Sequence, residues 1–308
     1  MRPGIILGVL LLAQAAPLRA AGSSAAQFLS LGFGARALGM GEAYTAVSDD
    51  ISAVYYNPAG LASGGEGREL AFSHAFHLED TSVSQAAYLR RPFAAAVTYF
   101  SAGELEGRDA TGGLTGDFSA RDVAAQLSRG FKLGPLDAGL TGRVISQRIR
   151  SSGATSFAAD AGLLYRFAGT PWSLGAAVTN LGTKVKFEEE SFPLPLKFKA
   201  GAAAAFSGAR LLLAVDAELP AEGPALARLG AEYTGLEGIA LRLGWRTAAS
   251  GQRDAILGRG FDEASGTAGL YGFFAGAGFA YAGFSLDYAL LPYGDLGTAH
   301  RFAVGLKF

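Results

Sequence analysis

Residues 210–219 read RLLLAVDAEL, and along this stretch apolar and charged side chains occupy alternate positions. The apolar members of one parity are Leu211, Leu213, Val215, Ala217 and Leu219, whereas Arg210, Asp216 and Glu218 have the other parity. Successive side chains of a β-strand point to opposite faces of its sheet. The stretch therefore predicts a strand with one apolar face and one charged face.

The same alternation recurs from about Arg68 to the end of the chain. It is clear in FAADAGLLYRF at 157–167, IALRLGWR at 239–246 and FSLDYAL at 284–290. The final residues, HRFAVGLKF at 300–308, continue it up to the last residue. Their apolar parity consists of Phe302, Val304, Leu306 and Phe308. We expect this terminal strand to close a barrel onto its first strand, because an open edge has no hydrogen-bond partner in lipid.

A soluble β-sandwich also alternates, so the connections must decide between it and a barrel. The candidate strands number fourteen, at 68–78, 82–91, 93–101, 118–131, 136–150, 155–167, 172–181, 195–207, 210–219, 225–235, 238–248, 268–279, 281–290 and 299–308. Links after even-numbered strands are short, whereas most links after odd-numbered strands are long, at 102–117, 182–194, 249–267 and 291–298. Short turns at one end and long loops at the other are typical of outer-membrane barrels. The sequence therefore predicts an all-β, antiparallel transmembrane barrel of about fourteen strands over residues 68–308.

Composition supports hydrocarbon-facing strands. The chain has 44 Gly, 21 Phe and 11 Tyr, and its apolar residues nowhere after residue 20 form a run long enough for a transmembrane helix. It has no cysteine, which excludes disulfides and thiolate metal sites. The formal net charge of −1 argues against a nucleic-acid partner.

Residues 1–20, MRPGIILGVLLLAQAAPLRA, have the parts of a secretory signal peptide. Arg2 supplies the positive start, residues 5–16 form a short apolar run, and Ala20 with Ala21 offers a small-residue cleavage site. We expect export, a bacterial outer-membrane location, and both termini of the mature chain on the periplasmic side.

Residues 21–67 do not alternate and are rich in glycine and other small residues. Asp49 or Asp50 is a candidate N-cap for a short helix over 51–56, and Asn57 followed by Pro58 should end that helix. A compact segment that precedes a barrel with a polar interior can fold inside the lumen of that barrel. We therefore expect residues 21–67 to form a hatch there. Its candidate gating residues are Gly39, Gly41, Asp49, Asp50, Asn57, Pro58 and Ala59.

Two stretches resemble a known family: GARALGMGEAYTAVSDDISAVYYNPAGLA at 34–62 and LDYALLPYGDLGTAHRFAVGLKF at 286–308. They look like the PorV/PorQ family of outer-membrane proteins, which is similar in architecture to the FadL fatty-acid channels. The resemblance implies a fourteen-stranded barrel with an N-terminal hatch. Glu42 departs from the family's glycine run, in which a second small residue often occupies this position.

The resemblance implies two functions. PorV-like members serve type IX secretion, in which case secreted proteins or secretion components would be the partners. FadL-like relatives admit hydrophobic small molecules. The main prediction is an accessory of protein export, the alternative is a hydrophobic-ligand channel, and a purely structural barrel in outer-membrane lipid is the third possibility.

Charged side chains on the predicted inward faces are candidates for ligand or peptide recognition, although a polar lumen needs such pairs in any case. They are Arg143, Asp160, Arg166, Asp216, Glu218, Arg228, Glu232, Arg242, Arg246, Asp287 and Arg301. No G-x-S-x-G nucleophile motif occurs, and the three histidines are scattered. We expect neither an enzyme nor a metal or cofactor site.

Overall fold

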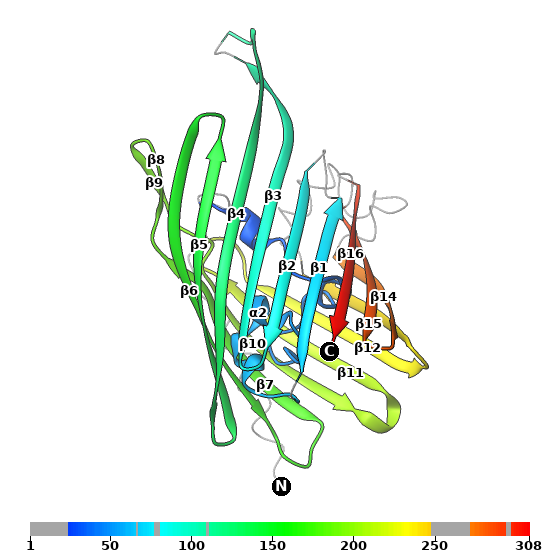
Figure 1. Cartoon of the computed structure of the whole chain (residues 1–308). Coiled ribbons are helices and arrows are strands. Elements are labelled where there is room, and N and C mark those ends of the chain that lie inside the picture. The colour runs from blue at the N-terminus through cyan, green and yellow to red at the C-terminus, as the bar shows by residue number, and fades with distance from the viewer. Residues whose placement is uncertain (1–23, 66, 77–80, 109–110, 248–271, 294–296) are drawn as a thin grey trace.

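The structure is a computed structural model that describes residues 24–65, 67–76, 81–108, 111–247, 272–293 and 297–308 (Figure 1). The predicted signal peptide and the predicted loop 249–267 lie outside these residues.

Fourteen strands of the described part form a closed antiparallel barrel, as the sequence predicts. Each pairs with its neighbours along the chain, except that β7 pairs with β10 and β1 pairs with β16. The barrel strands are β1 (Arg68–Phe76), β2 (Ser82–Arg90), β3 (Phe93–Arg108), β4 (Leu114–Leu133), β5 (Leu136–Ile149), β6 (Ser152–Arg166), β7 (Trp172–Gly182), β10 (Lys197–Phe206), β11 (Leu211–Pro220), β12 (Leu226–Leu236), β13 (Ile239–Arg246), β14 (Phe273–Tyr281), β15 (Phe284–Pro292) and β16 (Thr298–Lys307).

The terminal strand closes the wall. β16 pairs with β1 from Glu69 opposite Lys307 to Phe76 opposite His300, and it pairs with β15 on its other side. Phe308 extends this seam, because its N–H donates to the Arg68 carbonyl at 3.0 Å. Every barrel strand thus has two partners, which satisfies the backbone polar groups of a wall immersed in lipid.

Alternation divides the barrel wall into two faces. The outward face is apolar and exposed: Leu127 and Leu243, for example, expose 71% and 68% of their surface. Of the terminal residues, Phe302, Val304 and Phe308 are exposed and Leu306 is half-buried. The inward face carries buried charges such as Arg143 and Asp216. Within the described residues, no helix has the length and apolar character to cross a bilayer.

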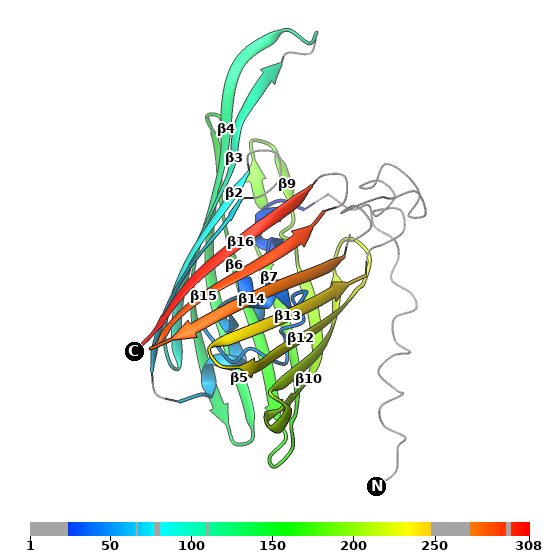
Figure 2. The same cartoon turned by 90° about the vertical axis from the view of Figure 1, so that its right-hand side faces the viewer.

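Residues 24–65, here called the hatch segment, lie inside the barrel (Figures 1 and 2). They form η2 (Gln27–Ser30), α1 (Ala35–Gly39), α2 (Ala53–Tyr56) and η3 (Pro58–Ala62). As expected, α2 ends before the Asn57–Pro58 pair, where Asn57 is extended. The N-cap differs from the prediction: it is Ser52, and Asp50 instead accepts a hydrogen bond from the Ser52 N–H at 2.8 Å.

Two predicted loops contain regular structure. Most of 102–117 belongs to β3 and β4, which continue as a hairpin beyond the rest of the barrel (Figure 2). The segment 182–194 contains a two-stranded sheet of β8 (Val185–Phe187) and β9 (Glu190–Phe192). The stretch 102–117 contains five glycines, which favour a loop, and β8 and β9 have three residues each, too few for a recognisable alternation.

Candidate functional site

The hatch segment rests directly on a row of inward-facing glycines. Gly130, Gly139 and Gly162 pair in register across β4, β5 and β6. A methyl group at Gly130 would lie 2.2 Å from the Ala62 nitrogen, and one at Gly139 would lie 2.1 Å from the Pro58 carbonyl carbon. Any side chain there would overlap the hatch backbone, so glycine is needed for this close approach.

A second set of glycines receives the other half of the segment. A methyl group at Gly244 of β13 would lie 2.0 Å from the Gly41 nitrogen, and one at Gly276 of β14 would lie 3.0 Å from the Gly39 Cα. The predicted gating residues Gly39 and Gly41 therefore lie against the wall of β13 and β14. Gly41 also has a φ of +65°, which favours glycine.

Asn57 joins the hatch segment to itself and to the barrel. Its side-chain amide donates to the Thr45 carbonyl at 2.8 Å and to the Leu163 carbonyl of β6 at 3.0 Å, and its Oδ1 accepts from the Ala59 N–H at 3.1 Å. The buried amide thus makes three hydrogen bonds, two as donor and one as acceptor. With Pro58 against Gly139, the Asn57-Pro58-Ala59 motif fixes the segment on β5 and β6.

Arg36 of α1 is the centre of a charge cluster between the hatch segment and the barrel. It lies 2.7 Å from Asp49, 2.9 Å from Asp50 and 2.7 Å from Glu232 of β12. Burial by itself raises the pKa of Asp50, but the charge of Arg36 and hydrogen bonds from Arg36, Ser52 and Tyr44 outweigh it. The pKa of Asp50 consequently lies below its ordinary value, and this carboxylate stays charged at neutral pH.

The remaining charges predicted for the lumen lie on the inward side of their strands. Asp216 accepts from the backbone N–H groups of Tyr44 and Thr45, at 3.0 and 2.8 Å. The other contacts are internal to the wall or reach the hatch segment: Arg143 with Asp160, Arg166 with Asp137, Arg228 with Glu218, Arg242 with Glu232 and Asp287, Arg246 over the Phe274 ring, and Arg301 with Gln85 and the Leu31 carbonyl. Asp216 and Arg301 thus hold the hatch segment, whereas the ion pairs within the wall neutralise its charges. Any part that they have in ligand recognition stays a prediction.

Other contacts could not be predicted from the sequence. Glu42, the position at which the chain departs from the glycine run of the family that it resembles, lies 3.4 Å from Arg228 and has a φ of +63°. Arg91, in the turn between β2 and β3, donates to the Gly60, Ser63 and Asp49 carbonyls. Both residues join the hatch segment to the barrel. Neither belongs to a sequence motif, so its role is recognised only from the residues that it contacts in the structure.

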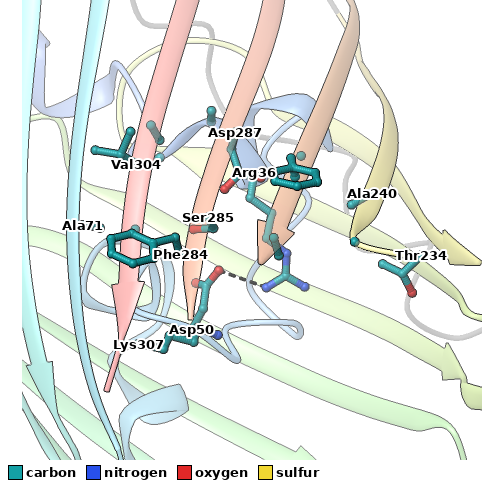
Figure 3. Close-up of a pocket in the computed structure, with 18 of the residues that line it drawn as sticks. Arg36, Asp50, Ala71, Thr234, Ala240, Phe284, Ser285, Asp287, Val304 and Lys307 are labelled. Carbon is teal, nitrogen blue, oxygen red and sulfur yellow. Dashed lines mark hydrogen bonds and ion pairs between the residues drawn. The ribbon is translucent and has the colours of Figure 1, made fainter. Parts of the chain in front are cut away.

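A cavity of about 1010 Å³ lies between the hatch segment and the wall of β12 to β16 and β1 (Figure 3). One part of its lining is charged and includes Arg36, Asp50 and Asp287. Another part is apolar and includes Phe33, Ile51, Ala71, Ala240 and Ala303. The cavity reaches the short-turn end of the barrel, since residues 237–238 and 282–283 also line it. Among the described residues no cluster of His, Asp and Glu could hold a metal ion.

Several solved structures of transporters share this fold. The chain aligns with the toluene transporter TbuX of Ralstonia pickettii at a TM-score of 0.59 and 15% identity, over 90% of this chain and 97% of that one. It aligns with the toluene transporter TodX of Pseudomonas putida at 0.60 and 13%, over 90% and 97%. A FadL homologue of Pseudomonas aeruginosa gives 0.52 and 13%, over 89% and 97%. No family model and no curated protein matches the sequence.

These likenesses show the fold, which this chain shares with the toluene transporters and the FadL homologue. The finer assignment to the PorV/PorQ family has no support from them, and neither has a role in type IX secretion.

Proposed function

We propose that this protein is an outer-membrane channel for small hydrophobic molecules, and not an enzyme or an export accessory. The observation that carries the proposal is the cavity of about 1010 Å³ beside the hatch segment. If the hatch contacted the barrel wall on all sides, it would be a purely structural plug of the lumen. Here Ala35 and Leu38 of the hatch pack on Ala289, Leu291 and Ala299 of β15 and β16, whereas nearer the short-turn end space remains between the hatch and β12 to β16 and β1.

The fold supports this proposal, because the toluene transporters named above have it over almost their whole length. Barrels of this size can enclose a ligand cavity or channel. We further propose that residues 24–65 act as the hatch, that the short turns and both termini face the periplasm, and that the gating residues Gly39, Gly41 and Asn57 keep the hatch in position while ligand passes beside it.

Narrowing the cavity tests the proposal. Ala303 of β16 faces inward and lines the cavity, whereas Ala277 of β14 faces outward and is exposed. In cells that depend on this protein, Ala303→Phe should slow the uptake of radiolabelled toluene several-fold, because its ring occupies the passage. Ala277→Phe adds the same ring to the lipid face and should leave uptake unchanged. Equal uptake by both variants, with both barrels folded, would contradict a route through this cavity.

A further inference from the structure

The outward face near the short-turn end carries three arginines in one row. Arg68 of β1 lies directly opposite Arg90 of β2, Arg90 lies opposite Phe93 of β3, and Phe93 lies opposite Arg129 of β4. All three arginines are exposed. Arg129 lies over the rings of Phe93 and Phe131, at 5.1 and 4.9 Å.

This row differs from the rest of the same rim. At the short-turn ends of other strands, exposed outward positions carry large aromatic side chains: Trp172, Phe206, Tyr281 and Phe284. Such side chains are typical of the belt at a membrane interface. The arginines are therefore a local departure confined to neighbouring strands.

Like charges directly opposite each other on a sheet destabilise it unless an anion compensates them. Within the described residues no carboxylate side chain forms an ion pair with Arg68, Arg90 or Arg129. The Phe308 carbonyl oxygen accepts from the backbone N–H of Arg68 at 2.8 Å, a contact that does not involve the guanidinium. Glu69 points inward, where it accepts a hydrogen bond from the Ile51 N–H. Three guanidinium groups thus outnumber the available negative charge.

An apolar groove of about 550 Å³ begins two residues further along the same strands. It is bordered by Phe72 of β1, Tyr88 of β2 and Phe284 of β15, and its floor includes the small side chains of Ala86 and Ala95. Leu70 and Tyr88 of the groove lie opposite each other, two residues along their strands from the pair Arg68 and Arg90 and on the same face of the sheet. The step along a strand is roughly 7 Å for two residues, so the groove starts within reach of a group held by the arginines.

We propose that this surface binds one anionic phospholipid of the membrane, with its phosphate on Arg68, Arg90 and Arg129 and one acyl chain in the groove of Phe72, Tyr88 and Phe284. Guanidinium groups hold phosphate oxygens through paired hydrogen bonds. In a membrane the occupant of an apolar groove on the barrel exterior is hydrocarbon, and a phospholipid supplies the phosphate and the hydrocarbon in one molecule. The site requires a barrel in a membrane, but it does not require the channel function.

Native mass spectrometry of the full-length folded protein tests the site, with phosphatidylglycerol and phosphatidylethanolamine of identical chains as probes. We expect the protein to retain one phosphatidylglycerol in preference to phosphatidylethanolamine. The double variant Arg68→Gln and Arg90→Gln should weaken phosphatidylglycerol binding roughly thirtyfold, since each interfacial arginine contributes a few-fold to attraction for anionic lipid.

The matched control is Arg121→Gln with Arg148→Gln. These arginines also lie opposite each other and are exposed, but they are at the other end of β4 and β5, away from the groove. This control should retain the lipid. If the two double variants bind phosphatidylglycerol equally, or if wild type does not prefer it, the proposal is overturned.

The groove has its own test. Ala86→Phe places a ring in the groove, so it should weaken long-chain phosphatidylglycerol and spare a six-carbon form. Equal weakening of both forms, or of neither, would overturn the assignment of the acyl chain to this groove. Preferential retention of lipopolysaccharide through Arg68 and Arg90 would overturn the assignment to phospholipid.

Discussion

At the scale of single residues, the position of the hatch segment depends on glycines whose role is visible only in three dimensions. Gly139 and Gly142 lie on the same strand, β5, but face opposite sides of the wall. A methyl group at Gly139 would lie 2.1 Å from the Pro58 carbonyl carbon, whereas one at Gly142 meets nothing within 4 Å. The two positions therefore separate the packing of the hatch from any general effect of glycine on the strand.

Gly139→Ala should displace η3 from the wall and lower the free energy of unfolding by about 1–3 kcal/mol, as overpacking of a tight contact does. Gly142→Ala should stay within about 0.5 kcal/mol of wild type. Urea unfolding in lipid vesicles, followed by tryptophan fluorescence, measures both. A destabilisation of equal size in the two variants would show that the Gly139 contact with Pro58 does not hold the hatch.

The sequence contains little information on these contacts. Alternation identifies Asp216 and Arg242 as inward-facing because parity along a strand fixes the face. It does not reveal that Asp216 accepts hydrogen bonds from Tyr44 and Thr45, since these residues are far apart in the chain. Glycine has no side chain whose character could indicate its partner. The contacts of Gly139 and Gly244 with the hatch therefore could not be predicted from the sequence.

At the scale of elements, the alternating pattern predicts strands where it extends over about ten residues without turn signals. The fourteen barrel strands follow from it, and most of their boundaries agree with the structure to within a few residues. The continuation of β3 and β4 over much of 102–117 does not, because the five glycines of this stretch favour a loop. Its strands are held by backbone hydrogen bonds to each other, which need no particular alternation of side chains.

The projecting hairpin of β3 and β4 can be removed to test whether the barrel folds without it. Beyond Ser101, β3 pairs only with β4, and before Ala120, β4 pairs only with β3. Replacing residues 105–118 by Asn-Gly joins the paired residues Glu104 and Ser119 by a two-residue turn that suits a hairpin, and it should leave the barrel folded. Heat-modifiable migration in gels would remain, and the urea midpoint would change little. Loss of the folded band would show that the projecting hairpin is needed to form the wall.

At the scale of the whole molecule, the division between an apolar exterior and a charged interior requires two different solvents. The same division also accounts for the closed seam between β1 and β16, because a lipid-facing edge would leave backbone groups unpaired. Exposure alone cannot distinguish the solvents, since an apolar side chain in the projecting hairpin is as exposed as one on the barrel wall. Leu114 exposes 67% of its surface and Leu243 exposes 68%.

These two leucines therefore test the placement of the whole barrel. Leu243 is in the middle of β13, on the wall, and Leu114 begins β4 in the hairpin beyond the wall. In lipid vesicles Leu243→Arg should lower the free energy of unfolding by about 2–4 kcal/mol, as a cation does near the centre of a bilayer, whereas Leu114→Arg should change it by about 0–1 kcal/mol. Urea titration of both variants in the same vesicles gives the comparison. If the two substitutions have equal effects, Leu243 does not face hydrocarbon, and the transmembrane placement of β13 is wrong.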